Sequence, residues 1–266
     1  ITEDEDWITL RVSAGENWHE FVSGCLREGR YGLENLALIP GTVGAAPIQN
    51  IGAYGVELEA FVVAVHALHL ETGEALKLDA AECGFGYRDS VFKHALRDTL
   101  VITAVDLRLP LRPSVRTDYP SLQQYLAGAG IGAPTPMDVF NAVVAIRSAR
   151  LPDPAAIPNA GSFFKNPVID PSWAAYMQAR HSNMPVFDGG SGRRKLSAAW
   201  LIDQCGWKGR REGGVGVHAD HALVLVHSGG ATGAELLALA ARIQESVLDR
   251  FGVRLEIEPR VYGDAR

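Results

Sequence analysis

The sequence predicts an α+β fold in two parts joined near residue 150, and three observations support this. Residues 7–13 alternate apolar and polar side chains like a strand, whereas residues 16–28 place apolar side chains at helical spacing. The chain of 266 residues is long enough for two domains of ordinary size, each with its own core. Residues 151–158 are rich in proline and are the best candidate for a linker between the two parts.

Further elements in the first part are expected to be short strands separated by loops. Residues 60–70 and 100–109 are rich in β-forming side chains, and residues 71–74 have the composition of a hairpin turn. The stretch from Ile39 to Gly55 is rich in glycine and poor in charge, so it cannot form one regular element.

Proline and capping residues predict four later helices, which start at Pro136, after Asp170, at Ser197 and at Thr232. Glu235 follows Thr232 at the spacing of a capping box. Gly252 ends this last helix, and residues 253–262 alternate like a final strand.

Composition excludes several classes of protein. Apolar residues make up 47% and charged residues 21%, which is typical of a soluble globular chain rather than a disordered one. A net charge of -6 argues against a nucleic-acid or anionic-membrane partner. No apolar run could span a bilayer, and Cys25, Cys83 and Cys205 form no C-x-x-C pair. We therefore expect a cytoplasmic protein with buried free thiols.

The histidines do not form a metal motif. His66 and His69 are three residues apart in a strand pattern, so they face opposite ways, and His218 and His221 lack a third ligand at suitable spacing. We expect no metal.

The glycine-rich stretch from Pro40 to Gly55 has two interpretations that the residues alone leave equally open. Glycines allow backbone amides to approach a phosphate, but the dinucleotide and P-loop patterns are absent. The alternative is a tight turn packed in a core, although Gln49, Asn50 and Tyr54 are costly to bury without a role.

Three other stretches carry candidate chemistry, and for the first and third the residues alone favour a solvated surface. Arg88, within residues 86–93, has the geometry to hold a carboxylate by two parallel hydrogen bonds. Ser162 begins a weak match to the S-x-x-K serine-nucleophile motif, which Ser90 also fits, and no K-T-G triplet occurs. In the third stretch, Glu256, Glu258 and Arg260 alternate and share one face of the expected last strand.

Together these stretches strongly resemble the UDP-N-acetylenolpyruvoylglucosamine reductases. Residues 35–55 resemble the flavin-binding core of that family, and residues 87–93, 159–167, 199–205 and 255–260 follow in the family's order. The match covers nearly the whole chain. Residues 182–185 and the insertion after them resemble the subtype with a substrate-capping loop.

The resemblance implies a fold and a reaction. Residues 1–150 would form the second lobe of a flavin-binding domain of the vanillyl-alcohol-oxidase type. Residues 151–252 would form an α+β substrate-binding domain, and residues 253–266 a C-terminal strand that carries the catalytic glutamate. NADPH and FAD would reduce UDP-N-acetylglucosamine enolpyruvate to UDP-N-acetylmuramate in peptidoglycan precursor synthesis, and we expect a monomer.

The resemblance also implies residue roles. Ser162 would donate the proton, while Arg88 and a protonated Glu258 would flank the substrate carboxylate. The residues expected to bind the cofactor are Gly41, Gly44, Ala45, Ala46, Pro47, Gln49, Asn50, Gly52, Ala53, Tyr54 and Arg260. Those expected to bind the substrate are Tyr119, Arg150, Lys165, Asn166, Met184 and Lys208, with Lys165 and Asn166 also orienting Ser162.

Departures from the family pattern leave two interpretations. The chain starts at Ile1 rather than at a methionine, and we expect that the family's N-terminal lobe is missing, that the end is cut short and that FAD is held weakly. Met184 stands where the subtype usually has a capping tyrosine, and Arg150 where the family often has lysine. The chain is then either a reductase, active or inactive as it stands, or a module that only holds a UDP-sugar.

Overall fold

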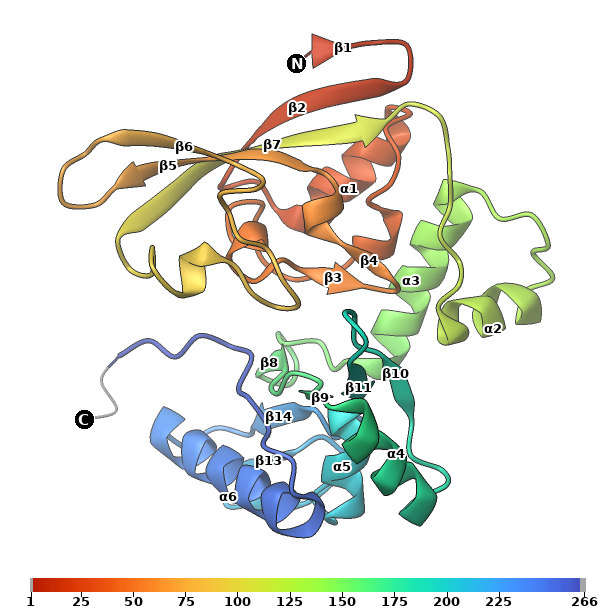
Figure 1. Ribbon diagram of the computed structural model, residues 1–266, viewed down its shortest axis with the longest axis vertical. Coiled ribbons are helices and arrows are strands. Elements are labelled where there is room, and N and C mark those ends of the chain that lie inside the picture. Colours follow the sequence, from red (N-terminus) through yellow and green to blue (C-terminus); the bar gives the residue numbers. More distant parts are fainter. Residues whose placement is uncertain (1, 264–266) are drawn as a thin grey trace. The chain divides into compact units, whose positions relative to one another are not determined.

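The computed structural model describes residues 2–263 and divides the chain into two compact units, Ile1–Arg147 and Ser148–Arg266 (Figure 1). The division falls close to the boundary expected near residue 150. Each unit mixes helices and strands around its own buried core. The α+β class is therefore confirmed.

The first unit is built on a five-stranded antiparallel sheet in the order β1-β2-β7-β5-β6. The strands are β1 (Thr2–Glu3), β2 (Trp7–Ser13), β5 (Val62–His69), β6 (Ala75–Asp79) and β7 (Leu100–Pro110). Ile8, Leu10 and Val12 share one face of β2 and are buried in the same core as the apolar face of helix α1 (Trp18–Arg27). The alternation in the sequence therefore marks the face that α1 covers.

The glycine-rich stretch forms no single regular element, as predicted. The short helix η1 (Glu34–Leu36) precedes it, and the stretch itself contains the short helix η2 (Ala46–Gln49) and β3 (Gly52–Ala53). β3 pairs with β4 (Val56–Glu57) just after the stretch, and η3 (Leu58–Ala60) follows. The unit is completed by η4 (Val91–Lys93), α2 (Pro120–Gly128) and most of α3 (Pro136–Arg150).

The second unit has two small sheets. One is four-stranded, β12 (Arg211–Glu212), β13 (Val215–Val217), β14 (Val224–His227) and β8 (Asn159–Ser162), and the other joins β10 (Val186–Asp188), β11 (Arg194–Leu196) and β9 (Val168–Ile169). Helices α4 (Pro171–Arg180), α5 (Ala198–Gln204) and α6 (Gly233–Phe251) pack their apolar side chains into one shared core.

The predicted helix ends are confirmed by their hydrogen bonds. Asp170 accepts from the Ser172 amide at 2.8 Å, and Ser197 accepts from the Trp200 amide at 3.2 Å. Thr232 and Glu235 form both bonds of a capping box. Gly252 ends α6 with a φ of 64°, a conformation that glycine adopts without strain.

The final strand predicted over residues 253–262 is wrong in its extent. The segment makes one isolated bridge, between Phe164 and Ile257. The backbone amide of Lys165 donates a hydrogen bond to the Glu256 carbonyl, and the amide of Glu258 donates one to the Phe163 carbonyl. Pro259 has no amide hydrogen to continue the ladder, so pairing stops there. The alternation in the sequence instead reflects Val253 and Leu255 packing into the core.

Candidate active site

The predicted site residues of the first unit gather around the glycine-rich stretch and the turn that contains Arg88. Asn50, Tyr54 and Arg88 all have positive φ, at 44°, 48° and 54°. Non-glycine residues rarely adopt this conformation, and such strain concentrates at functional sites. The sequence did not predict these positive φ angles, because none of the three residues is a glycine.

Asn50 connects these two segments through its buried side chain. Its Nδ2 donates to the Gly86 carbonyl at 3.0 Å, and its Oδ1 accepts from the Glu59 amide at 2.9 Å. Ser90 adds a second link by donating to the Ile48 carbonyl at 2.6 Å. The turn that bears Arg88 is thus fixed to the glycine-rich stretch at two points.

Arg88 itself lies against that stretch. Its Nη2 donates to the Gly52 carbonyl at 2.5 Å, and its guanidinium lies 5.2 Å from the centre of the Tyr87 ring. A Cβ at Gly52 would sit 3.0 Å from Arg88 Nη1 and 2.9 Å from Glu57 Cγ. Gly52 is therefore required for this close approach. Lys93 Nζ donates a hydrogen bond to the Arg88 carbonyl at 3.1 Å and so stabilises the turn.

Arg147 on α3 is a second cation in this cluster that sequence reasoning missed. Its Nε donates to the Leu38 carbonyl at 3.3 Å. Burial lowers the pKa of its guanidinium, Tyr54 acts in the opposite direction, and the nearby Arg88 lowers the pKa further. No carboxylate pairs with it among residues 2–263. Helical periodicity places Arg147 on α3 but does not reveal contacts with residues about a hundred positions earlier.

Two aromatic side chains complete the cluster. The rings of Tyr54 and Tyr119 meet edge to face with centroids 5.2 Å apart. Tyr119 stands just before α2 and is exposed. The structure thus brings together one residue predicted to bind the cofactor and one predicted to bind the substrate.

The first part of the expected phosphate cradle is occupied by the protein's own backbone. The amides of Gly44, Ala45 and Ala46 donate to the carbonyls of Ala14, Thr42 and Val43 at 2.9, 3.1 and 3.3 Å. Gly44, Ala46, Pro47 and Asn50 are buried. The open part of the stretch is Gly41 and Ala45, which are exposed, with Gln49, Gly52, Ala53 and Tyr54 half-buried.

Gly44 has a structural reason to be glycine. A Cβ there would lie 2.4 Å from Ala14 Cβ and 3.0 Å from Ala14 Cα, closer than atoms can approach. We expect Gly44→Ala to lower the free energy of unfolding by about 1–3 kcal/mol, as overpacking usually does. Urea unfolding measures this.

Gly24 in α1 is the matched control for that substitution, because a Cβ there meets nothing within 4 Å. Gly24→Ala should leave stability unchanged or raise it by up to about 1 kcal/mol, since alanine favours helix. Equal effects of the two substitutions would contradict the packing role of Gly44.

In the second unit, Ser162 ends β8 and Glu258 lies on the segment beside it. Ser162 pairs with Val224 of β14. The amide of Glu258 donates to the carbonyl of Phe163, the next residue after Ser162, at 2.9 Å. Both residues are half-buried. Gly161, with a φ of 70°, supplies the irregular backbone just before the serine.

Lys165 and Asn166 have partners other than Ser162. Lys165 is buried and its Nζ lies 2.5 Å from Glu256 Oε1. Asn166 Oδ1 accepts from the Ala198 amide at 2.9 Å and so supports the start of α5. The structure gives these two side chains a supporting role, and their predicted contact with substrate stays a prediction.

Arg150 and Lys208 are exposed, as residues that bind an anion should be, and both lie near His221. Arg260 is half-buried, and its guanidinium lies 4.8 Å from the centre of the Tyr262 ring. Their ligand contacts stay predictions.

Met184 is placed in the core of the second unit, where only 3% of it is exposed. A capping residue would need its side chain at the surface. We therefore expect Met184→Tyr to lower stability by about 1–3 kcal/mol, because a larger ring with a hydroxyl must fit a closed space. Thermal unfolding tests this, with Phe187→Tyr, at a side chain that is 39% exposed, as control. Unchanged stability with tighter substrate binding would instead favour the capping role.

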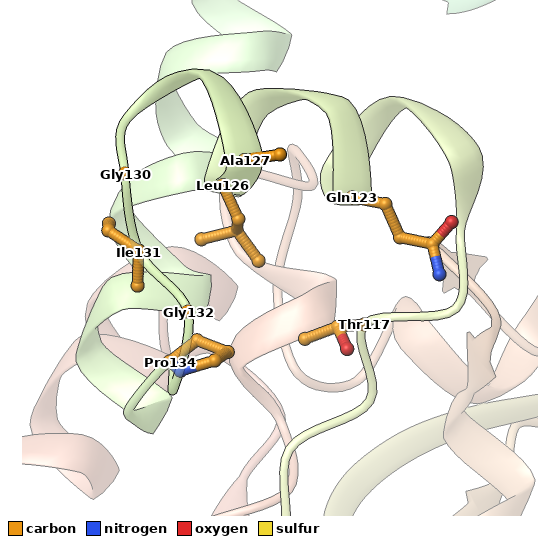
Figure 2. A pocket seen from close by; sticks show the side chains of 8 residues that line it. All are labelled: Thr117, Gln123, Leu126, Ala127, Gly130, Ile131, Gly132 and Pro134. Carbon is orange, nitrogen blue, oxygen red and sulfur yellow. The ribbon is translucent and has the colours of Figure 1, made fainter.

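One cavity lies away from these clusters. It has a volume of about 400 Å³ and lies beside α2 and the loop after it, where Leu126 and Ile131 are among its lining side chains (Figure 2). None of the predicted site residues lines it.

Neither membrane spans nor metal clusters were found in the part of the chain that the structure covers. None of the helices within residues 2–263 combines the length and hydropathy that a bilayer crossing requires. The same residues contain no group of three His, Cys, Asp or Glu arranged for a metal ion.

Comparison with known proteins identifies the family. Residues 1–79 match an FAD binding domain, and residues 153–262 match the C-terminal domain of UDP-N-acetylenolpyruvoylglucosamine reductase. The reductase of Chromobacterium violaceum is 53% identical over 98% of this chain and 77% of its own length. That of Burkholderia pseudomallei strain K96243 is 54% identical over 97% of this chain and 75% of its own length.

The fold agrees with a solved structure. The crystal structure of the UDP-N-acetylenolpyruvylglucosamine reductase from Thermus caldophilus superposes with a TM-score of 0.66 and 26% identity, covering 96% of this chain and 73% of that one. The resemblance in the motifs therefore extends to sequence, domains and fold, and the chain belongs to the UDP-N-acetylenolpyruvoylglucosamine reductase family.

Proposed function

We propose that Ser162, Arg88 and Glu258 carry the catalytic step in this chain. The family's reaction is the reduction of UDP-N-acetylglucosamine enolpyruvate in peptidoglycan synthesis, with FAD as cofactor and NADPH as reductant. The observation that supports the assignment most strongly is the backbone pairing of Glu258 with Phe163, which puts Glu258 beside the segment that presents Ser162.

The chemistry requires one proton donor and stabilisation of negative charge. FAD, once reduced by NADPH, would supply a hydride to the methylene carbon of the enolpyruvyl group. The neighbouring carbon then carries enolate character that extends onto the carboxylate. Ser162 donates a proton to that carbon from its hydroxyl, because an enolate is basic enough to take it.

Arg88 and Glu258 act on the substrate carboxylate in this proposal. Arg88 is held by the Gly52 carbonyl and by a strained turn, so its guanidinium needs little reorganisation to bind a carboxylate. Glu258, when protonated, donates a hydrogen bond to the same charge without repelling it. Preorganised donors of this kind are typically the largest contribution to stabilising such a transition state.

The residues of the first unit fit an FAD site in part. A Cβ at Gly41 would meet nothing nearer than 4.0 Å, so the chain is open there, and Gly52 to Tyr54 stay half-buried. The cations Arg88 and Arg147 lie beside them and suit an electron-rich or anionic group. We assign the cofactor to Gly41, Ala45, Gln49 and residues 52–54, with Arg260 from the second unit, rather than to the occupied amides of residues 44–46.

Domain roles follow the same division. We assign cofactor binding to residues 1–150 and substrate binding to residues 151–252, with residues 253–266 carrying Glu258. Arg150 and Lys208 bind the diphosphate of the substrate, and Tyr119 also contacts the nucleotide.

The setting of the reaction is also a proposal. Each unit buries its own core, so neither needs a second copy to cover apolar surface, and we propose a cytoplasmic monomer. The net charge of -6 disfavours nucleic acid and anionic membranes as partners. Light scattering on the protein as it elutes from a size-exclusion column measures its molar mass and so tests the monomer.

A direct test of the proposed function is NADPH oxidation by the FAD-loaded protein with and without the enolpyruvyl substrate. We expect oxidation that depends on the substrate. An ultraviolet-visible spectrum of the desalted protein shows whether flavin is retained. A protein that binds UDP-sugars but never flavin would instead be a binding module.

A further inference from the structure

Asn35 has a buried side chain without a role in the proposed reaction. The residue is only 1% exposed. Its Nδ2 donates one hydrogen bond to the Tyr54 carbonyl at 2.9 Å and another to the Arg116 carbonyl at 2.8 Å. These carbonyls lie 19 and 81 residues away along the chain. A side-chain amide has two N–H donors, and here each of them binds a different segment.

The backbone that carries Asn35 is fixed on both sides. The flanking residues of η1, Glu34 and Leu36, are buried. The Leu36 carbonyl accepts from Trp18 Nε1 at 2.9 Å, and Glu34 Oε2 accepts from the Gly32 amide at 2.7 Å. Trp18 and Leu36 both belong to the core of the first unit. The amide of Asn35 is therefore presented from a rigid position.

The first partner of Asn35 lies in the turn between β3 and β4. Tyr54 and Gly55 are the two residues of this turn, and both have positive φ, at 48° and 82°. Tight hairpins favour this geometry, but a tyrosine rarely adopts it. The hydrogen bond from Asn35 to the Tyr54 carbonyl stabilises the unusual backbone conformation, which in turn sets the direction of the tyrosine ring.

The second partner lies in the irregular segment of residues 111–118 that leads from β7 into α2, on which Figure 2 shows Thr117. Within residues 2–263, the bond from Asn35 to the Arg116 carbonyl is the one hydrogen bond that reaches the backbone of residues 112–118. Val115 adds apolar packing against the core. The position of Tyr119, three residues after Arg116, therefore depends on Asn35.

The two segments meet again through their tyrosine rings. Tyr54 and Tyr119 lie edge to face with centroids 5.2 Å apart. Tyr119 is 41% exposed and Tyr54 is half-buried, so the pair is accessible from solvent. One buried amide thus acts on both rings, on Tyr54 through its own carbonyl and on Tyr119 through the segment before it.

We propose that Asn35 is a positioning residue, which sets the Tyr54–Tyr119 pair and raises the affinity for the substrate's nucleotide through Tyr119. This inference rests on the proposed function, which assigns Tyr119 to that nucleotide. The physical basis is preorganisation, because a side chain that is already held in place loses less conformational entropy when a ligand binds. Asn35 is too deeply buried to contact the ligand itself.

Limited digestion with trypsin tests the hydrogen bond to Arg116 without any ligand. Trypsin cuts after Arg116, at the peptide bond whose carbonyl Asn35 binds, whereas the Arg112–Pro113 bond resists it. Asn35→Asp keeps the shape of the side chain but replaces its two N–H donors by an oxygen. We expect slow cleavage after Arg116 in the wild type and cleavage about tenfold faster in this variant. Cleavage after Arg193, which is exposed in the other unit, is the internal reference and should not change.

A double-mutant cycle tests the effect on the nucleotide, with UDP-N-acetylglucosamine as the probe in calorimetry. Asn35→Asp and Tyr119→Ala should each weaken binding by about five- to tenfold. If Asn35 acts through Tyr119, adding Asn35→Asp to Tyr119→Ala should change the affinity by less than about twofold. In a Lys208→Ala background the effect of Asn35→Asp should persist in full, because Lys208 belongs to the other unit.

Two further variants separate positioning from general loss of stability. Val65→Ala removes buried contacts in β5 without touching either segment. It should lower the melting temperature and leave both the affinity and the cleavage after Arg116 unchanged. Asn35→Ser retains one hydroxyl donor and replaces Asn35→Asp if that variant does not fold, and it should show the same pattern with smaller effects.

The possible outcomes separate the inference from the proposed function. Rapid cleavage of the wild type after Arg116 would overturn the inference, whether or not the variants fold. Additive effects of Asn35→Asp and Tyr119→Ala, or an equal loss of affinity in Val65→Ala, would overturn the positioning role and leave the substrate site intact. Failure of the wild type to bind UDP-N-acetylglucosamine, or unchanged affinity in Tyr119→Ala, would overturn the proposed nucleotide contact and the inference with it.

Discussion

Ser162→Ala in the FAD-loaded protein is expected to slow the reoxidation of reduced flavin by the enolpyruvyl substrate by about 10²–10⁴-fold. This is the usual effect of losing a positioned general acid and corresponds to roughly 3–5 kcal/mol. The reduction of the flavin by NADPH should stay nearly unchanged, because that step delivers no proton to carbon. Stopped-flow measurement of the two half-reactions separates these rates.

Two further variants distinguish proton donation from a structural role. Ser162→Cys should recover part of the loss, because a thiol in the same position can still donate. Ser148→Ala, at an exposed helical position in the same unit, is the control and should change neither half-reaction. If Ser162→Ala slows both half-reactions together and lowers the melting temperature, the serine acts on packing. A variant that reacts with the substrate at the wild-type rate would exclude Ser162 as the donor.

Arg88→Lys is expected to reduce the rate with the enolpyruvyl substrate by on the order of 10²–10³, comparable to the loss of one preorganised donor at a developing charge. Arginine has three nitrogens, so it can bond the Gly52 carbonyl and still make two parallel hydrogen bonds to a carboxylate. Lysine retains the positive charge, but its single nitrogen cannot do both. Reduction by NADPH should change much less.

The control for Arg88→Lys is Arg112→Lys, since the Arg112 side chain is 77% exposed and lies on the same unit. It should leave both half-reactions unchanged. A product-release step that limits the rate would mask the effect, so the comparison uses single-turnover traces. Unchanged reoxidation by the substrate in Arg88→Lys would show that charge alone suffices and that the paired hydrogen bonds contribute nothing.

Local signals in the sequence predicted much of the fold. Asp170 and Thr232 begin helices through bonds to amides two and three residues away, so their effect is readable from neighbouring letters. Residues 71–74 form the turn between β5 and β6 for the same reason, with Gly73 at a φ of 71°. Such short-range hydrogen bonds do not depend on the rest of the molecule.

Features that depend on distant contacts were not predictable. Gly44 looks like a phosphate contact in the sequence, yet its proximity to Ala14 explains why glycine stands there. Met184 sits between polar and proline residues, and only the folded unit shows that it is buried. Arg147 gains its significance from groups that tertiary structure brings near it. Roles for Ser162 and Glu258 came from family resemblance rather than from physics.

The segment that carries Glu258 has a consequence for how activity responds to temperature and denaturant. It is tied to the unit by backbone hydrogen bonds at Glu256 and Glu258, by a hydrogen bond from Gln244 to the Leu255 carbonyl, by the Lys165 ion pair and by the packing of Val253 and Leu255. A segment outside the regular strands opens at a lower free energy than the sheet it borders. The fraction of molecules with Glu258 in place is then a local equilibrium of its own. Activity is expected to fade before the cores unfold, and amide exchange at Glu258 reports that equilibrium separately from global stability.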